Sequence, residues 1–268
     1  MTTFQALLLG IVQGLTEFLP VSSSGHLVLL QNLFNIDLSG VDMFYDITLH
    51  LGTLFAVFAV FYKDIFNLFR RPGKNLLYLI FASLPAAVVG IFFGDIIDEL
   101  FFGGKYLFIC FLITAAMLAS AQIYAKKSKN VLPLNKKSVA VMALAQAVAV
   151  IPGISRSGAT AAAGTLAGAD REQAAKFSFL MSIPVIAGSF FITLVKGIGG
   201  GEFASVFINS GQNLGLCVAV SIAAAAVSSL ASVKIMLKAA TKANYIPFIV
   251  YLLILSALCA YLTFSGRL

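Results

Sequence analysis

The chain has 268 residues, of which 60% are hydrophobic and only 11% are charged, and its mean hydropathy is +0.97. A soluble domain carries roughly 25% charged residues and lacks the interior to bury so many apolar side chains, so the composition excludes a water-soluble globule. The net charge of +7 comes largely from lysines and arginines in short loops between apolar runs, which argues against a nucleic-acid partner and indicates contact with a lipid bilayer.

The first apolar stretch, residues 4–34, contains the polar sequence QGLTEFLPVSSSGH at positions 13–26. Gln13 and Glu17 are four residues apart, so they share one face of a helix that a proline ends. Three serines, a glycine and then His26 follow, which predicts a turn rich in hydroxyl and amide groups. Because the chain leaves this stretch on the outer side of the membrane, we expect a re-entrant hairpin here.

Six longer apolar runs approach the roughly 20 residues that cross a hydrocarbon core. Lysines and arginines gather in alternate connections, at 63–75, 126–137, 166–176 and 234–242, which the positive-inside rule assigns to the cytoplasm. The other connections and the C-terminus then lie outside. The predicted spans are 47–62, 76–96, 105–125, 175–196, 213–236 and 245–265.

The second interrupted stretch, residues 138–165, lies between two inside loops, so it must enter and leave the membrane by the same face. Its break reads PGISRSGAT at positions 152–160. The glycines allow backbone N–H groups to approach an anion closely, and a guanidinium presents a planar fork of donors suited to phosphate. This hairpin is therefore predicted to bind phosphate through Arg156 and its neighbours.

The order of elements is a hairpin and three spans, repeated once. Because three is odd, the second copy is inverted, and a shift of 133 residues aligns Gln13 with Gln146 and Ser22 with Ser155. We predict an all-α integral membrane protein with about six transmembrane helices and two re-entrant helical hairpins in inverted-topology repeats. Such breaks meet near the membrane midplane. The predicted units of this single membrane domain, 1–268, are repeat one at 1–125, a cytoplasmic loop at 126–137 and inverted repeat two at 138–265.

The two breaks together offer an acid, an amide, a histidine, an arginine and several hydroxyl groups. That set suits phosphoryl transfer, in which positioning and charge stabilisation supply most of the catalysis. Glu17 and Gln13 provide oxygen ligands of the kind that Mg²⁺ or Ca²⁺ prefers, so we expect a divalent cation there.

Each of these residues also has a structural interpretation. Glu17 could simply pair with Arg156, His26 could cap a helix, and the serines could pack helices closely. His50, at the start of a span, is interpreted as structural. The three cysteines, in separate apolar runs, predict no disulfide framework or metal site. The small-residue stretch at 223–226 packs helices within one subunit or in a homodimer, and the sequence leaves both open.

The two motifs, QGLTEFLPVSSSGH and PGISRSGAT, resemble those of the undecaprenyl-pyrophosphate phosphatase family of bacterial membranes, the bacitracin-resistance type. That family carries a Glu/Gln-x-x-x-Glu motif before a serine-rich turn with His, and later a Pro-Gly-x-Ser-Arg-Ser-x-x-Thr motif. Length and hydropathy fit over the whole chain. This sequence carries Gln13 at the first acidic position, and a neutral amide cannot act as a base.

The resemblance implies hydrolysis of undecaprenyl pyrophosphate to undecaprenyl phosphate, which recycles the lipid carrier for cell-wall synthesis. It further implies a divalent cation, the bacterial inner membrane, and an active site open to the periplasmic face. The catalytic residues it implies are Glu17, Ser23, His26 and Arg156. The residues implied in phosphate binding are Ser22, Ser155, Arg156, Ser157 and Thr160, with Glu17 and Gln13 as ligands of the metal.

Two alternatives come from other classes of protein. A phosphatidic-acid-type phosphatase also uses SGH and SR strings, but here SGH precedes the Lys63…Arg71-Pro72 segment and residue 162 is alanine, so we set it aside. A membrane transporter or lipid-phosphate flippase is the second alternative, because inverted repeats suit alternating access. The sequence leaves open whether His26, Ser23 or water is the nucleophile.

Overall fold

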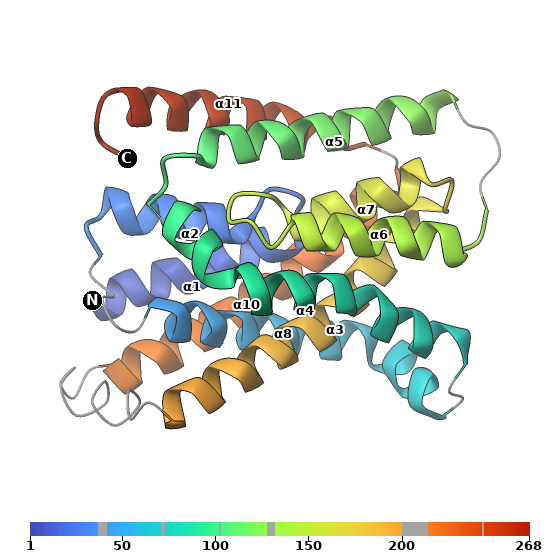
Figure 1. Ribbon diagram of the computed structural model, residues 1–268, viewed down its shortest axis with the longest axis horizontal. Coiled ribbons are helices and arrows are strands. Elements are labelled where there is room, and N and C mark those ends of the chain that lie inside the picture. The colour runs from blue at the N-terminus through green and yellow to red at the C-terminus, as the bar shows by residue number, and fades with distance from the viewer. Residues whose placement is uncertain (37–41, 71–72, 102, 128–131, 200–213, 243) are drawn as a thin grey trace.

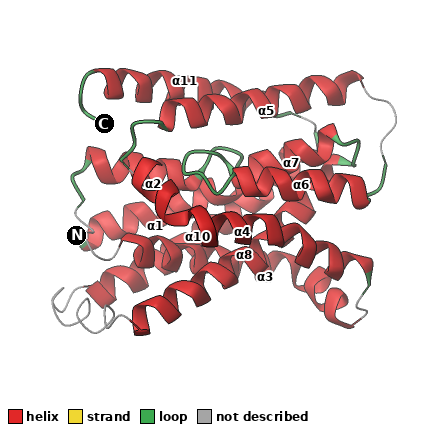
Figure 2. Ribbon diagram, in the orientation of Figure 1, coloured by secondary structure: helices red, strands yellow, loops and turns green. Residues whose placement is uncertain are grey.

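The apolar runs of the sequence form long helices that lie side by side along the longest axis of the molecule (Figure 1). The computed structural model describes the chain except for residues 37–41, 71–72, 102, 128–131, 200–213 and 243. Figure 2 shows that regular structure in this part of the chain is helical. The helices are α1 (Thr3–Phe18), α2 (Ser23–Leu33), α3 (Asp42–Arg70), α4 (Lys74–Phe101), α5 (Leu107–Lys127), α6 (Lys136–Val148), α7 (Arg156–Leu166), α8 (Arg171–Gly199), α10 (Leu214–Thr241) and α11 (Ile246–Phe264).

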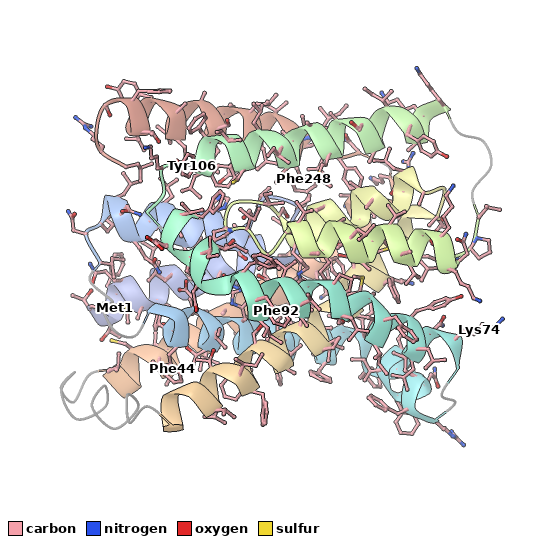
Figure 3. The ribbon with its side chains drawn as sticks, viewed as in Figure 1. Met1, Phe44, Lys74, Phe92, Tyr106 and Phe248 are labelled. Carbon is pink, nitrogen blue, oxygen red and sulfur yellow. The ribbon has the colours of Figure 1, made fainter. Side chains whose placement is uncertain are left out.

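Six of the described helices, α3, α4, α5, α8, α10 and α11, are long and apolar enough to cross a membrane. Each overlaps one predicted span, so the predicted all-helical membrane fold is confirmed. Large apolar side chains cover the outer surface, as the sticks in Figure 3 show, and Phe92 and Phe264 are 72% and 82% exposed. Such a surface is stable only against lipid.

The helices extend past several predicted boundaries. The α3 element continues to Arg70, but its backbone is non-helical at Phe61 (φ −106°, ψ 20°), one residue before the predicted end of the span at residue 62. Beyond this kink the chain is helical again and carries Lys63, Asp64 and Arg70, whose long or charged side chains reach water. The predicted end of the span is therefore a kink, after which a second helical segment continues.

The two interrupted stretches form helical hairpins, α1–α2 and α6–α7. With 16 and 13 residues, α1 and α6 span only about 24 and about 20 Å, less than a hydrocarbon core. The hairpins enter from opposite ends of the molecule, and their turns meet near its centre (Figure 1). This is the re-entrant arrangement that the sequence predicts, while the exact division into repeats at 1–125 and 138–265 stays a prediction.

Serine caps begin the second helix of each hairpin. Ser22 caps α2 by accepting a hydrogen bond from the Gly25 N–H at 3.3 Å, and Ser155 caps α7 by accepting one from Gly158 at 3.0 Å. These caps satisfy N–H groups that a helix leaves unpaired at its start. They also place the next residue, Ser23 or Arg156, in the first turn of its helix at the centre of the molecule.

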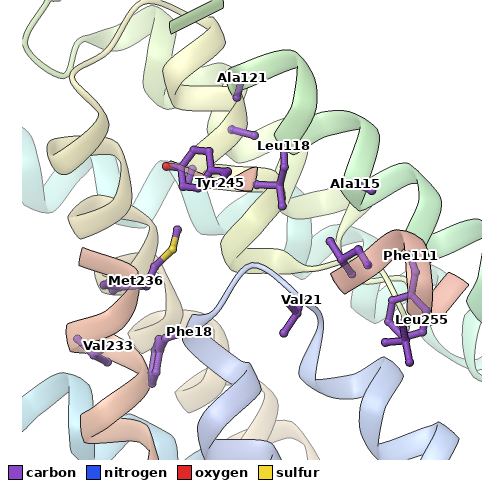
Figure 4. Packing of buried hydrophobic residues seen from close by; sticks show 14 of the residues in the cluster. Phe18, Val21, Phe111, Ala115, Leu118, Ala121, Val233, Met236, Tyr245 and Leu255 are labelled. Carbon is purple, nitrogen blue, oxygen red and sulfur yellow. The ribbon is translucent and has the colours of Figure 1, made fainter. Parts of the chain in front are cut away.

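The first hairpin is held by close packing against α10 and by a buried apolar cluster. A Cβ atom added to Gly10 or Gly14 would clash with backbone atoms of α10, so the two helices approach as closely as their backbones allow. Phe18 packs edge-on against Phe179 of α8 at a ring distance of 5.3 Å, within the cluster that Figure 4 shows around Val21. This packing fixes the end of α1, where Glu17 lies.

Candidate active site

Glu17, in the last turn of α1, is only 6% exposed and is bonded to residues of both hairpins. Its Oε1 accepts a charge-assisted hydrogen bond from the guanidinium of Arg156, which is 139 residues away in the sequence. Its Oε2 accepts bonds from Ser23 Oγ at 2.6 Å and from Gln13 Nε2 at 3.0 Å. The two breaks predicted to meet therefore do so around one buried carboxylate, whose charge the arginine balances.

Arg156 is held on two sides. Besides Glu17, its guanidinium donates to the backbone carbonyl of Ser178 on α8 at 3.3 Å. The side chain is 15% exposed, so part of it faces open space. A planar guanidinium fixed in this way keeps further N–H donors available for a phosphoryl group.

The remaining hydroxyls of the second turn mostly bind protein groups. Ser157 donates to the carbonyl of Leu19 in the first hairpin at 3.0 Å, and Thr160 bonds to the Arg156 carbonyl at 2.7 Å and to the Ser178 hydroxyl at 2.6 Å. Neither lines the cavity described below. Their predicted role in phosphate binding stays a prediction, and their contacts hold Arg156 and the two hairpins in place.

A cavity of about 400 Å³ lies beside the Glu17–Arg156 pair. It is lined by residues of the two hairpins and of α3, α4 and α8. Its volume is in the range of small-molecule sites, and its walls are mainly apolar with a few convergent polar groups. The polar residues that line it include Glu17, Ser22, Ser23, His50, Ser155 and Arg156.

His26 is turned away from this cavity. Its Nδ1 donates to the carbonyl of Ser22 at 2.6 Å, because a carbonyl can only accept, and its Nε2 is 2.6 Å from the hydroxyl of Tyr251 on α11. The two rings are nearly parallel, 3° apart. His26 thus supports the backbone at Ser22, which has an unusual φ of 70° for a residue other than glycine. The predicted role of His26 as acid, base or nucleophile stays a prediction.

His50 is the histidine that faces the cavity, and the sequence analysis interpreted it as structural. Its Nδ1 bonds to the carbonyl of Asp46 one turn earlier in α3 at 2.7 Å, and its Nε2 is 3.4 Å from Glu17 Oε2. One signal could have identified it: an ionisable side chain inside a membrane span is by default a candidate for function. Its contact with Glu17 depends on how α3 packs against α1, which the sequence does not reveal.

Gln13 and Glu17 do not fit a resident cation as they are arranged. Both carboxylate oxygens of Glu17 already accept hydrogen bonds, and Gln13 turns its NH₂ group, not its oxygen, towards them. The Gln13 oxygen is buried with no hydrogen-bond partner among the described residues. Within that same part of the chain, no three His, Cys, Asp or Glu side chains gather as a metal site. We therefore derive no step of a reaction through a metal held by this pair.

Known proteins with related sequences share nearly the whole length of this chain. The family model described as bacitracin resistance protein BacA matches residues 6–258. An undecaprenyl-diphosphatase of Parabacteroides distasonis is 37% identical over 259 residues, or 94% of each chain. Those of Carboxydothermus hydrogenoformans and Geotalea daltonii are 37% and 38% identical, and the matches cover 100% and 94% of each chain.

Proposed function

We propose that this chain, which belongs to the BacA family of bacitracin resistance proteins, removes the terminal phosphate of undecaprenyl pyrophosphate in the cavity beside Glu17 and Arg156. Membership confirms the resemblance predicted from the two motifs, and the chain is a multi-pass membrane hydrolase. Its lipid product, undecaprenyl phosphate, returns to cell-wall synthesis. One observation carries the choice of site: a buried carboxylate that accepts hydrogen bonds from both a guanidinium and a serine hydroxyl.

Ser23 is the nucleophile in this proposal, and Glu17 is its base. The Ser23 hydroxyl already donates to Glu17 at 2.6 Å, which is the geometry that activates a serine. As Oγ attacks the terminal phosphorus, the bond from that phosphorus to the bridging oxygen breaks. The bridging oxygen leaves with its electron pair as part of undecaprenyl phosphate, and Glu17 passes the serine proton to it.

A water molecule completes the cycle. It attacks the phosphorus of phosphoserine and gives a proton to Glu17, the bond between Ser23 Oγ and phosphorus breaks, and Glu17 returns the proton to Ser23. Arg156 stabilises the negative charge on the phosphoryl oxygens in both steps, where a fixed donor in a site of low dielectric is most effective. A divalent cation, Mg²⁺ or Ca²⁺, would be held by the pyrophosphate itself and would lower the charge of the substrate.

In this proposal the molecule lies in the bacterial inner membrane and its cavity opens to the periplasm. Two observations support this orientation. The end of the molecule near Lys74 carries the basic connections, including those at Lys126–Lys127 and Lys136–Lys137 (Figure 3). The lining of the cavity extends along α4 in the other direction, to Asp95 and Asp98. Basic connections mark the cytoplasmic side.

The test is release of inorganic phosphate from undecaprenyl pyrophosphate by the purified protein in detergent, with and without EDTA. We expect metal-dependent release, abolished in Glu17→Ala and lowered about 10³-fold or more in Ser23→Ala. Ser24→Ala, a neighbouring hydroxyl that does not touch Glu17, is the control. Activity of Ser23→Ala close to that of the wild type would exclude Ser23 as the nucleophile and leave His26 or water. No release by the folded wild type would reject the hydrolase and favour a transporter or flippase.

A further inference from the structure

Two groups of glycines in the helices differ in what a side chain at their position would meet. A Cβ atom on Gly10, Gly14 or Gly52 would clash with a neighbouring backbone, so close helix packing explains these three. At Gly90 and Gly94 of α4, by contrast, no described atom of another element lies within 4 Å of that position, and the same holds at Gly188 of α8.

Neither packing nor backbone geometry requires the second group. None of the three has a positive φ, and glycine inside a helix costs about 1 kcal/mol relative to alanine. Gly90, Gly94 and Gly188 all line the cavity, whereas Gly215 of α10, whose Cβ would also meet open space, does not. Their missing side chains therefore keep space open beside the Glu17–Arg156 pair, and space maintained at a cost in helix stability points to a ligand.

The shape of this space is a groove between two helices. The residues of α4 that line it, from Ser83 to Asp98, recur at spacings of three and four, so they form one face of the helix over about 22 Å. Small or apolar residues of α8 face them, and the two helices pack together (Figure 1). On α4 the groove is lined by Ser83, Ala86, Ala87, Gly90, Ile91 and Gly94. On α8 its lining includes Val185, Gly188, Ser189 and Ile192.

A second observation is a buried polar group in the wall of the cavity that has an acceptor without a partner. Gln146 of α6 lines the cavity and is only 1% exposed. Its Nε2 donates to the carbonyl of Ala82 on α4 at 3.1 Å, while its Oε1 is buried with no hydrogen-bond partner among the described residues. An unsatisfied buried acceptor is costly, so a donor from a ligand or its hydration shell belongs there.

We propose that the groove between α4 and α8 binds the first isoprene units of the prenyl chain, and that Gly90, Gly94 and Gly188 make it wide enough for them. The inference rests on the proposed function, which fixes the pyrophosphate at Ser23 and Arg156. From there the chain must leave along apolar walls, and the groove is continuous with the site. Ile91 and Ile192, at 62% and 39% exposed, place its edge on the lipid-facing surface, where the rest of the chain joins the bilayer.

The experiment fills the groove and varies the length of the substrate. Gly90→Leu and Gly188→Leu are compared with Gly215→Leu, a matched control on α10 whose Cβ also meets open space but which does not line the cavity. For undecaprenyl and farnesyl pyrophosphate we expect KM to rise at least about tenfold in the groove variants. For isopentenyl pyrophosphate, which has a single isoprene unit, we expect the change to stay below about threefold.

The outcomes separate this inference from the proposed function. Equal losses on long and short substrates, or no loss on either, would overturn the groove while leaving the hydrolase intact. If the wild type releases no phosphate at all, the proposed function fails. Binding of a prenyl pyrophosphate analogue then tests the groove without any activity. A farnesyl pyrophosphate analogue carrying a benzophenone should then label peptides of α4 and α8, and labelling confined to other helices would overturn the groove.

Discussion

At the residue scale, His50 contacts Glu17 and lines the cavity, whereas His26 does neither. The motif draws attention to His26 because it follows the serines directly, but the backbone turn directs its ring towards Tyr251 and away from the cavity. His50, outside both motifs, contacts Glu17 instead. Sequence proximity predicts which residues share a turn, whereas the direction of a side chain depends on which helix packs beside it.

We therefore predict that His50 contributes to the reaction. His50→Ala should lower kcat/KM by about 10²-fold, the effect of removing one polar group from a preorganised site, with little change in melting temperature. His50→Gln keeps a polar nitrogen within reach of Glu17 and should recover part of the loss. Steady-state kinetics with thermal unfolding in detergent checks this, and an unchanged kcat/KM in His50→Ala would return His50 to its structural interpretation.

We predict that Gln13 controls whether the site binds a divalent cation. Replacing it with glutamate removes the NH₂ group that donates to Glu17 and puts two carboxylates on one helix face, a ligand set suited to a hard divalent ion. We predict that Gln13→Glu binds Mn²⁺ in the absence of substrate, whereas the wild type and Gln13→Ala bind it at least about tenfold more weakly. Electron paramagnetic resonance of free Mn²⁺ measures this without activity. Equally tight binding by the wild type would show that the present pair already holds a cation.

At the scale of elements, the sequence predicted both hairpins and their serine turns, because proline, glycine and serine act through local backbone chemistry. Ser22 and Ser155 are caps in equivalent positions, as the shift of 133 residues suggested. Predicted helix ends were less accurate, since α10 continues several residues into charged sequence and α3 resumes as a helix after its kink at Phe61. Helix contacts were not predictable, because the glycines of α1 look alike whether they face lipid or another helix.

The packing of α1 on α10 makes a prediction about stability. A methyl group at Gly14 would overlap the Ala225 carbonyl and the Ser228 hydroxyl, and only the hydroxyl can move aside. Gly14→Ala should therefore lower the melting temperature in detergent and reduce activity, since Glu17 is one turn away. Gly215→Ala, in open space on α10, should leave both unchanged or slightly raise the melting temperature. Equal melting temperatures for the two variants would mean that α1 does not pack this closely.

At the scale of the whole molecule, the charge in the connections and the opposed hairpins are both compatible with the orientation proposed above. A polar site at membrane depth is tolerated because it is enclosed by helices and lined by paired groups, as Glu17 and Arg156 are. The sequence could predict this convergence from topology, since an inverted hairpin must meet its counterpart from the other side. It could not predict the cavity, which depends on the side chains missing from α4 and α8.

The orientation can be measured with single cysteines, because the native Cys110, Cys217 and Cys259 are buried and should not react. Lys105→Cys and Lys137→Cys place exposed thiols at opposite ends of the molecule. If the basic end is cytoplasmic, a membrane-impermeant maleimide added to intact spheroplasts should label Lys105→Cys, while Lys137→Cys should react only after permeabilisation. The opposite pattern would place the mouth of the cavity in the cytoplasm, so a lipid pyrophosphate presented at the outer face could not reach Ser23.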